Sequence, residues 1–145
     1  MKIKNGIFEN KQYIKTIEKI HNSDQLSIMD AYRINRLVGK LSELQEEYGE
    51  IKKKIFDQYG TLNEEEGTIT ISAEDRAGFN TEYNDLLDIE HNLETEKLPF
   101  PNKIEDGFSA TDLNVLETFF DLSGLEEKPK EDEPDNTTPT EQESE

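Results

Sequence analysis

The chain has 145 residues, no cysteine, and a formal net charge of −18 from 34 acidic and 16 basic side chains. Its length leaves room for one domain with a modest core, and the lack of cysteine excludes disulfides, thiol nucleophiles and thiolate metal sites. No run approaches the roughly 18 apolar residues of a membrane span, and the start MKIKNGIFENK lacks the apolar stretch of a signal peptide. We therefore expect a cytoplasmic protein that does not bind membranes.

Charge is divided unevenly along the chain. Residues 1–60 carry 11 basic and 9 acidic side chains, residues 61–125 carry 3 and 16, and residues 126–145 carry 2 and 9. The N-terminal part can therefore attract the rest, within one chain or between neighbouring chains. Direct binding to nucleic acid is disfavoured, because the phosphate backbone would be repelled.

The N-terminal segment is short and mixed. Residues 1–8 alternate weakly around Ile3 and Ile7, which indicates a short strand. Residues 11–20 place their apolar side chains on one helical face and predict a short helix. Polar residues at 22–24 then break the pattern.

The stretch from Leu26 to Gly60 predicts one long amphipathic helix. Ser27 and Asp30 have the spacing of an N-terminal capping box, and Gly60 follows the last large apolar residues. About 32 residues at 1.5 Å each give a rod of roughly 48 Å. The apolar face of this helix is expected to pack against another helix, and the charged face is expected to lie in water. The seam repeats at the a/d spacing of a coiled coil and consists of Ile34, Leu37, Leu41, Leu44, Tyr48, Ile51 and Ile55.

Shorter elements follow the long helix. Residues 63–67 are a turn signal, and the β-branched residues 68–71 predict a strand. Ser72 and Asp75 form a second capping box, which opens a helix expected to reach Asn92. This helix is the natural intramolecular partner for the seam.

The C-terminal part is predicted to begin in an extended conformation. Two prolines limit residues 93–100 to the edge of a sheet. A third box, Ser109 with Asp112, opens a last helix that we expect to stop at Gly124. Residues 126–145 carry three prolines and no large apolar side chain, which predicts a disordered acidic tail.

The fold class that follows is an α-rich α+β domain over residues 1–125. In it the long helix packs antiparallel on residues 73–92, beside a few short strands. The disordered acidic tail over residues 126–145 lies outside the domain.

Candidate catalytic and metal-binding groups are sparse. His91 lies near several carboxylates and His21 is the only other imidazole, and a solvated helix face accounts for both better than a zinc site does. Residues 63–66 gather acids without the spacing of an EF-hand. The sequence has no nucleophile-elbow, phosphate-loop or zinc-protease motif. We therefore expect no enzyme, no catalytic residue, no metal and no cofactor.

Partner-binding residues are predicted from a difference in length. The second helix spans roughly 30 Å, so part of the longer seam is left uncovered, most simply at one of its ends. Two adjacent phenylalanines at the end of the last helix either close the core or expose a hydrophobic hook. The candidates are Ile34 and Leu37 at one end of the seam, Ile51 and Ile55 at the other, and Phe119 and Phe120 in the last helix.

The order of these elements carries a resemblance. With the segments SIMDAYRINRLVGKL, ISAEDRAGFNTEYNDLLDIEHNLE and SATDLNVLETFFDL, the chain resembles a family of short proteins of unknown function encoded by tailed phages and prophages of Gram-positive bacteria. The resemblance covers roughly residues 1–122 and rests on patterns rather than on an invariant site. It implies a viral accessory or structural component, located in the host cytoplasm or in the virion, and supplies no catalytic residues.

Two functions are consistent with these observations. The first is a non-catalytic phage protein that acts in virion structure or assembly through helix-mediated contacts with protein partners, either itself or other phage components. The alternative is an acidic inhibitor that presents carboxylates in place of phosphates to a host nucleic-acid-binding defence factor. A mimic needs carboxylates in ordered rows, whereas 9 of the 34 acids lie in the predicted tail, which favours the first function.

Overall fold

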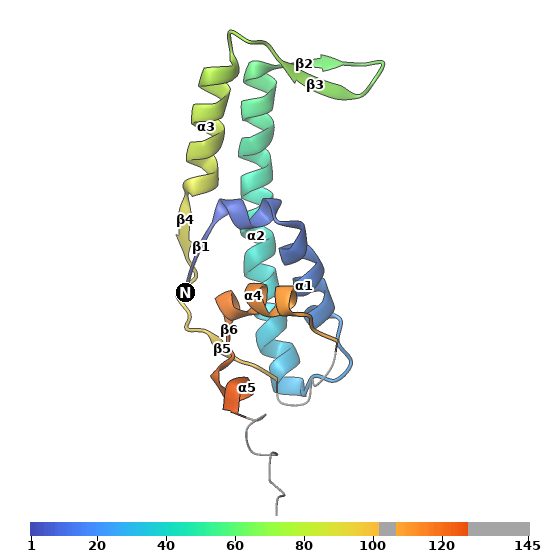
Figure 1. The fold of residues 1–145 in the computed structure, drawn as a ribbon, viewed down its shortest axis with the longest axis vertical. Coiled ribbons are helices and arrows are strands. Elements are labelled where there is room, and N and C mark those ends of the chain that lie inside the picture. Colours follow the sequence, from blue (N-terminus) through green and yellow to red (C-terminus); the bar gives the residue numbers. More distant parts are fainter. Residues whose placement is uncertain (102–106, 128–145) are drawn as a thin grey trace, which may run out of the picture.

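The structure, a computed structural model, describes residues 1–101 and 107–127 (Figure 1). It is rich in helix with a few short strands, as the sequence predicts. In chain order the elements are β1 (Lys2–Lys4), the 3-10 helix η1 (Asn5–Glu9), α1 (Lys11–His21), α2 (Ile28–Tyr59), β2 (Gly60–Asn63), β3 (Thr68–Ile71), α3 (Arg76–Asp88), β4 (Glu90–Asn92), β5 (Leu98–Pro99), α4 (Ala110–Phe119), β6 (Phe120–Asp121) and α5 (Ser123–Glu127).

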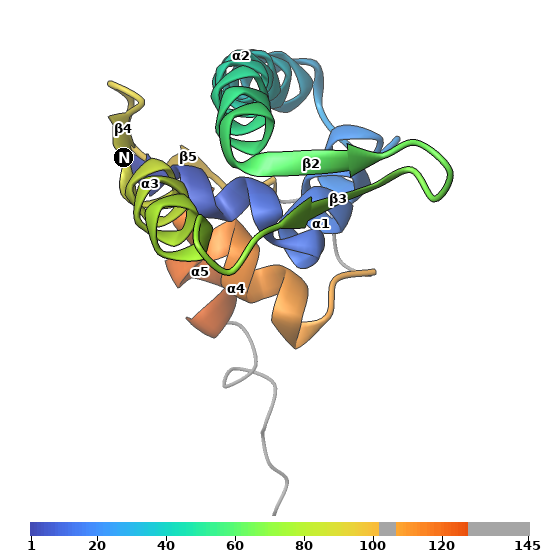
Figure 2. The same ribbon diagram turned by 90° about the horizontal axis from the view of Figure 1, so that it is seen from above.

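The long helix α2 is the axis of the molecule. It begins where predicted, because Ser27 Oγ accepts a hydrogen bond from the Asp30 backbone N–H at 3.1 Å. Figures 1 and 2 show η1 and α1 against its N-terminal half and middle, and α3 beside its C-terminal half, running in the opposite direction. The predicted antiparallel packing on a second helix is therefore present, but it covers only about half of α2.

The main core lies where α1 packs between α4 and the N-terminal half of α2. Its side chains come from all three helices and from β6, so the seam of α2 is covered there by elements of the same chain. Each fully buried Leu, Ile or Phe contributes about 1.5 to 3 kcal/mol relative to an exposed one. The largest fully buried apolar side chains are Ile20, Ile34, Leu41, Leu116, Phe119 and Phe120.

A buried carboxylate fastens α1 to α4. Asp112 is 2% exposed, and its Oδ1 accepts hydrogen bonds from Gln12 Nε2 at 2.8 Å and from Thr16 Oγ1 at 2.5 Å. Its Oδ2 accepts from Lys19 Nζ at 2.7 Å and from the Ser109 backbone N–H at 2.9 Å. Burial alone would raise the pKa of Asp112, but these donors outweigh it and hold the pKa well below its ordinary value. The predicted capping box of α4 thus also joins two helices.

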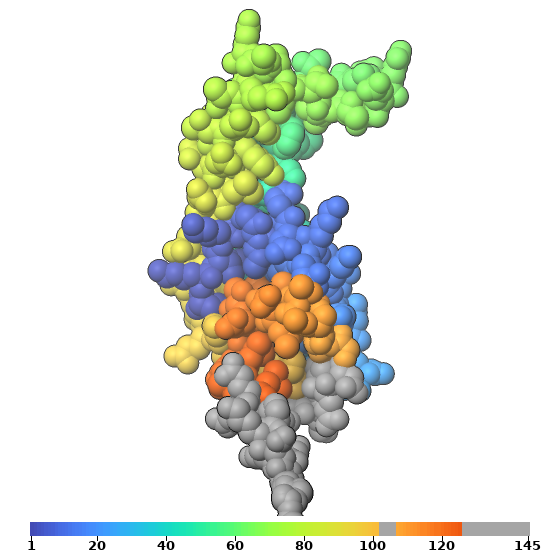
Figure 3. Space-filling view, viewed as in Figure 1, coloured from blue at the N-terminus to red at the C-terminus, as the bar shows by residue number. Residues whose placement is uncertain are grey.

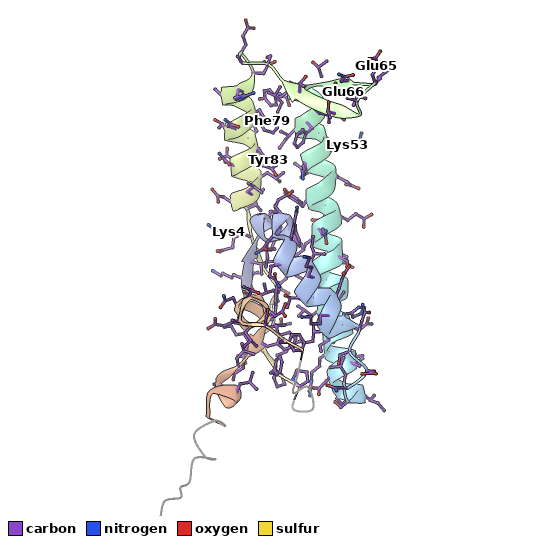
Figure 4. The ribbon with its side chains drawn as sticks, turned by 45° about the vertical axis from the view of Figure 1, so that its right-hand side comes forward. Lys4, Lys53, Glu65, Glu66, Phe79 and Tyr83 are labelled. Carbon is purple, nitrogen blue, oxygen red and sulfur yellow. The ribbon has the colours of Figure 1, made fainter. Side chains whose placement is uncertain are left out.

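Aromatic side chains hold α3 against the end of α2. The ring of Phe79 lies edge-on at 5.1 Å from that of Phe56 and at 6.3 Å from that of Tyr59, between centroids. Tyr83 stacks on Phe79 at 5.5 Å, and Figure 4 shows both on the side of α3 that faces α2. At Gly78 an added Cβ would lie 3.1 Å from the Tyr59 ring, so the glycine permits this close approach.

The strands of the described residues form three two-stranded pairings. β1 pairs antiparallel with β4, β2 pairs antiparallel with β3 as a hairpin, and β5 pairs in parallel with β6. The first pairing corrects the predicted strand over residues 1–8, because only Lys2–Lys4 is extended and η1 follows at once. Short pairings of this kind add local support to a helical domain rather than a separate sheet layer.

The second predicted helix is shorter than expected at both ends. α3 begins at Arg76, so Asp75 does not lie in its first turn as the predicted capping box requires. Ser72 and Asp75 instead form a turn just before the helix, in which the Asp75 backbone N–H donates to Ser72 Oγ. At the other end α3 stops at Asp88, because the next residues leave the helix to pair with β1. The prediction that this helix reaches Asn92 is therefore wrong.

The last predicted helix is divided in two. α4 ends at Phe119 rather than at Gly124, because β6 pairs with β5 directly afterwards. Asp121 Oδ1 then accepts the first backbone N–H of α5 at 3.0 Å, and Gly124 lies inside that short helix. Residues 128–145 of the predicted tail lie outside the described residues, and its first two residues belong to α5.

Candidate protein-docking surface

The structure buries five of the six predicted partner-binding residues in the chain's own core. The difference in length between the two long helices is real, but α1 and its neighbours cover the half of α2 that α3 leaves free. The two phenylalanines close the core and form no exposed hook. Only Ile51, 45% exposed, keeps a large accessible surface. The five buried residues are Ile34, Leu37, Ile55, Phe119 and Phe120.

Other large apolar side chains are exposed at the start of α2. Ile28 is 88% exposed, Met29 55% and Tyr32 56%. Burial of Ile34 and Leu37 fixes the rotation of the helix, so the residues on its other side must face outward. Three cations continue the same stripe at intervals of three and four residues. We call the whole stripe the α2 face, and it consists of Ile28, Met29, Tyr32, Arg33, Arg36 and Lys40.

A pocket of about 360 Å³ lies beside the α2 face. This volume falls in the lower part of the range of roughly 300 to 1,000 Å³ that is typical of ligand-binding clefts. Three cations and one carboxylate line it, so its potential favours an acidic occupant in a chain that is otherwise strongly negative. The lining residues are Tyr32, Arg33, Arg36, Leu37 and Lys40 from α2, and Leu93, Glu94, Thr95 and Leu98 from the segment that leads from β4 into β5.

The cations of the α2 face differ in how they are engaged. Arg33 Nη1 lies 3.5 Å from a carboxylate oxygen of Asp30, one turn earlier. The Arg36 guanidinium carbon lies 5.9 Å from the centroid of the Tyr32 ring, a cation–π distance. Among the described residues, neither Arg36 nor Lys40 forms an ion pair with a carboxylate. Both side chains are exposed, so within this part of the chain their charges face the solvent.

A second apolar surface lies on the hairpin at the opposite end of α2. Leu62 and Ile69 stand directly opposite each other in the register, so they share one face of the ribbon, and they are 59% and 44% exposed. At Gly60 an added Cβ would overlap the Ile69 side chain, which explains the glycine at this strand start. Figure 3 shows the hairpin projecting beyond the helices as an arm, and Figure 4 places Glu65 and Glu66 at its tip. We call these residues the hairpin face: Leu62, Ile69, Glu64, Glu65 and Glu66.

The titratable groups in the middle of the molecule are engaged in structural contacts. Glu9 Oε1 accepts hydrogen bonds from Lys52 Nζ at 2.5 Å and from Tyr48 Oη at 2.6 Å, and these bonds lower the pKa of Glu9. Burial, together with the contact to Glu9, raises the pKa of Tyr48. His91 Nε2 lies 2.8 Å from Asn5 Oδ1. In the described residues, no group of three or more His, Cys, Asp or Glu side chains is placed to hold a metal ion.

Sequence reasoning missed the α2 face because it followed only the buried seam. A signal was present in the segment SIMDAYR, where Ile28, Met29 and Tyr32 lie outside the a/d positions set by Ile34 and Leu37. Large apolar residues off the seam, within the first turns of a helix, indicate a second surface.

Comparison with known proteins gives no match: no family model, no curated protein and no solved structure matches this chain. None of the helices in the described residues is long and apolar enough to span a membrane. We therefore infer function from the surfaces of the molecule itself.

Proposed function

We propose that this chain is a non-catalytic protein of a tailed phage or prophage, and that it acts in virion structure or assembly through helix-mediated contacts with protein partners. One observation carries the proposal. Three large apolar side chains at the start of α2, each more than half exposed, adjoin three cations and a pocket on the same helix face. Aromatic, Met and Arg side chains are the residue types enriched at protein interfaces. The phage assignment is supported by the resemblance of the sequence patterns.

The chemistry of the α2 face favours an acidic protein surface with an apolar side chain at its centre. Covering the exposed parts of Ile28, Met29 and Tyr32 would contribute about 3 to 6 kcal/mol. Association costs at least about 4 kcal/mol in lost translational and rotational freedom. The apolar patch alone therefore gives little net affinity, so the cations must also find partners.

A non-catalytic role is supported by the contacts of two carboxylates, the buried Asp112 and the exposed Glu9. Asp112 has all four of its donors in place, and Glu9 holds Lys52 and Tyr48. A general acid or base needs a group whose pKa is moved toward neutrality and which reaches a substrate cavity. Asp112 and Glu9 have their pKa values moved the other way.

The alternative function, an acidic inhibitor of a host nucleic-acid-binding defence factor, has one observation in its favour. Four exposed glutamates on the outer face of α2 recur at intervals of three and four residues and so form a regular carboxylate row. Two lysines follow this row directly, which interrupts a continuous negative surface. The row consists of Glu43, Glu46, Glu47 and Glu50, and the lysines are Lys53 and Lys54.

Fractionation of a phage-producing host lysate tests the proposed function. We expect a tagged wild-type chain to sediment with capsid or tail intermediates, and Tyr32→Asp to remain in the light fractions. The matched control is Gln45→Asp, which places the same charge at an exposed position of α2 outside the α2 face and should keep the wild-type distribution. Both variants should show wild-type circular dichroism. A wild-type chain that never leaves the light fractions but blocks DNA binding by a host factor would instead support the inhibitor.

A further inference from the structure

We infer that the partner bound by the α2 face is the hairpin face of a second copy of this chain, so that copies join head to tail. This inference rests on the proposed function and deepens it, because it names the partner. It requires that the two surfaces match in apolar character and in charge, and that they cannot meet within one molecule.

The hairpin has an apolar face that needs a cover. A two-stranded ribbon by itself is only marginally stable in water. The cross-strand pair Leu62 and Ile69 lies on one side, while the threonine pair Thr61 and Thr70 lies on the other. Two adjacent apolar side chains that are about half exposed at the end of an arm indicate a contact with another molecule.

The charges of the two surfaces are complementary. The hairpin tip carries three consecutive glutamates, and its turn is fixed by Asn63, whose Oδ1 accepts the backbone N–H groups of Glu65 and Glu66 at 3.1 and 3.3 Å. The α2 face carries Arg33, Arg36 and Lys40 around its pocket. In this contact the apolar side chains of the hairpin face would lie on those of the α2 face, and the acidic tip of the hairpin would lie at the basic pocket.

The two surfaces cannot meet within one chain. From Lys40 to Gly60 the helix rises by about 30 Å at 1.5 Å per residue. Figures 1 and 4 show the hairpin at one end of α2 and the helix start at the other. A contact between them is therefore a contact between copies. Since it joins two different patches, it is heterologous and produces either a closed ring or an open filament.

Sedimentation velocity on the full chain provides the first test. We expect the wild-type chain to form oligomers larger than a dimer as its concentration rises. The oligomers should be smaller at high ionic strength, because the contact includes exposed charges that salt screens. Glu65→Lys with Glu66→Lys should weaken the contact at least about tenfold. The control pair Glu46→Lys with Glu47→Lys makes the same change in net charge away from both surfaces and should not weaken it.

A mixing experiment distinguishes the head-to-tail arrangement from a symmetric dimer. Ile28→Asp with Tyr32→Asp disables the α2 face. Leu62→Thr with Ile69→Thr disables the hairpin face and places a β-branched residue, which suits a strand, at both positions. Each variant alone should be monomeric. Mixed in equal amounts, they should form a 1:1 heterodimer and stop there, because one intact face remains on each. A mixture that stays monomeric would overturn the inference.

By charge alone, the acidic residues 131–135 would be an alternative partner for the cations of the α2 face. A full chain with Glu131→Gln, Asp132→Asn, Glu133→Gln and Asp135→Asn should assemble like the wild type, and loss of assembly would overturn the inference. A wild-type chain that is monomeric throughout the micromolar range would overturn it as well. If such a chain still sedimented with phage intermediates, the proposed function would stand without it.

Discussion

Replacing Asp112 with Asn tests the contact that joins α1 to α4. The side chain keeps its shape, but an amide offers one acceptor oxygen and one NH2 group in place of two carboxylate oxygens. The NH2 group must therefore face two of the four donors that surround Asp112. The cheapest orientation turns it toward Thr16, whose hydroxyl can rotate and accept, and leaves the carbonyl toward Lys19 and Ser109.

The expected loss of stability follows from the hydrogen bonds and the charge that the Asn side chain lacks in this orientation. Hydrogen bonds to a charged group contribute about 1.5 to 3 kcal/mol each, and neutral ones about 1 kcal/mol. Lys19 is partly exposed, so water replaces some of its lost attraction. We expect Asp112→Asn to lower the free energy of unfolding by about 2 to 3 kcal/mol near neutral pH. Glu117→Gln, at an exposed position of the same helix, should change it by less than about 0.5 kcal/mol.

The pH dependence provides an independent check. The pKa of Asp112 is lower in the folded state than its ordinary value of about 3.9 in the unfolded chain. Its contribution to stability is therefore complete above the unfolded pKa and is lost as the pH falls below it toward the folded pKa. Urea unfolding followed by circular dichroism should give a constant difference between wild type and variant above about pH 5, and a shrinking one in acid. A difference below about 0.5 kcal/mol, or one independent of pH, would refute the reasoning.

Four further substitutions test the packing of α2 and of the strand start that follows it. Leu41→Ala should lower the free energy of unfolding by about 2 to 5 kcal/mol, because Leu41 is 2% exposed. Leu44→Ala should lower it clearly less, because Leu44 is only partly buried, and equal values in urea unfolding would contradict this order. Gly49→Ala should stabilise by about 0.5 to 1 kcal/mol, since an added Cβ meets open space in the interior of a helix, and a lowered melting temperature would count against it. Gly60→Ala should destabilise by about 1 to 3 kcal/mol, because its Cβ would overlap Ile69, and unchanged thermal melting would disprove that contact.

Periodicity and capping chemistry were enough to predict most of the helices. The N-cap of α2 at Ser27 and the full capping box of Ser109 and Asp112 depend on residues three positions apart, which a sequence displays directly. The strand over residues 68–71 was likewise visible in its β-branched run. These features are local, so no knowledge of the tertiary fold was required.

The errors arose where distant segments decide the local structure. Helical periodicity continued past Asp88, but pairing with β1 ended the helix there. Pairing with β5 ended α4 at Phe119 in the same way. The partner-binding residues were misplaced for a related reason, because the half of α2 that carries Ile34 is covered by α1 rather than by α3. No spacing within α2 could reveal which element would lie on it.

The strand β1 must wait for its partner β4 during synthesis, because β4 is translated much later. Asn5 and His91, which meet at the end of this pairing, are 86 residues apart in the chain. A ribosome that adds about 5 to 20 residues per second leaves β1 without its partner for roughly 4 to 17 s. Lys2 and Lys4 flank the one buried side chain of the strand, and charged lysines discourage an unpaired edge from joining another chain. In the folded chain Lys2 lies 3.6 Å from Glu90 and Lys4 lies 3.9 Å from Asp88. The lysines that discourage wrong pairing of the nascent strand therefore also form ion pairs with the segment that it finally joins.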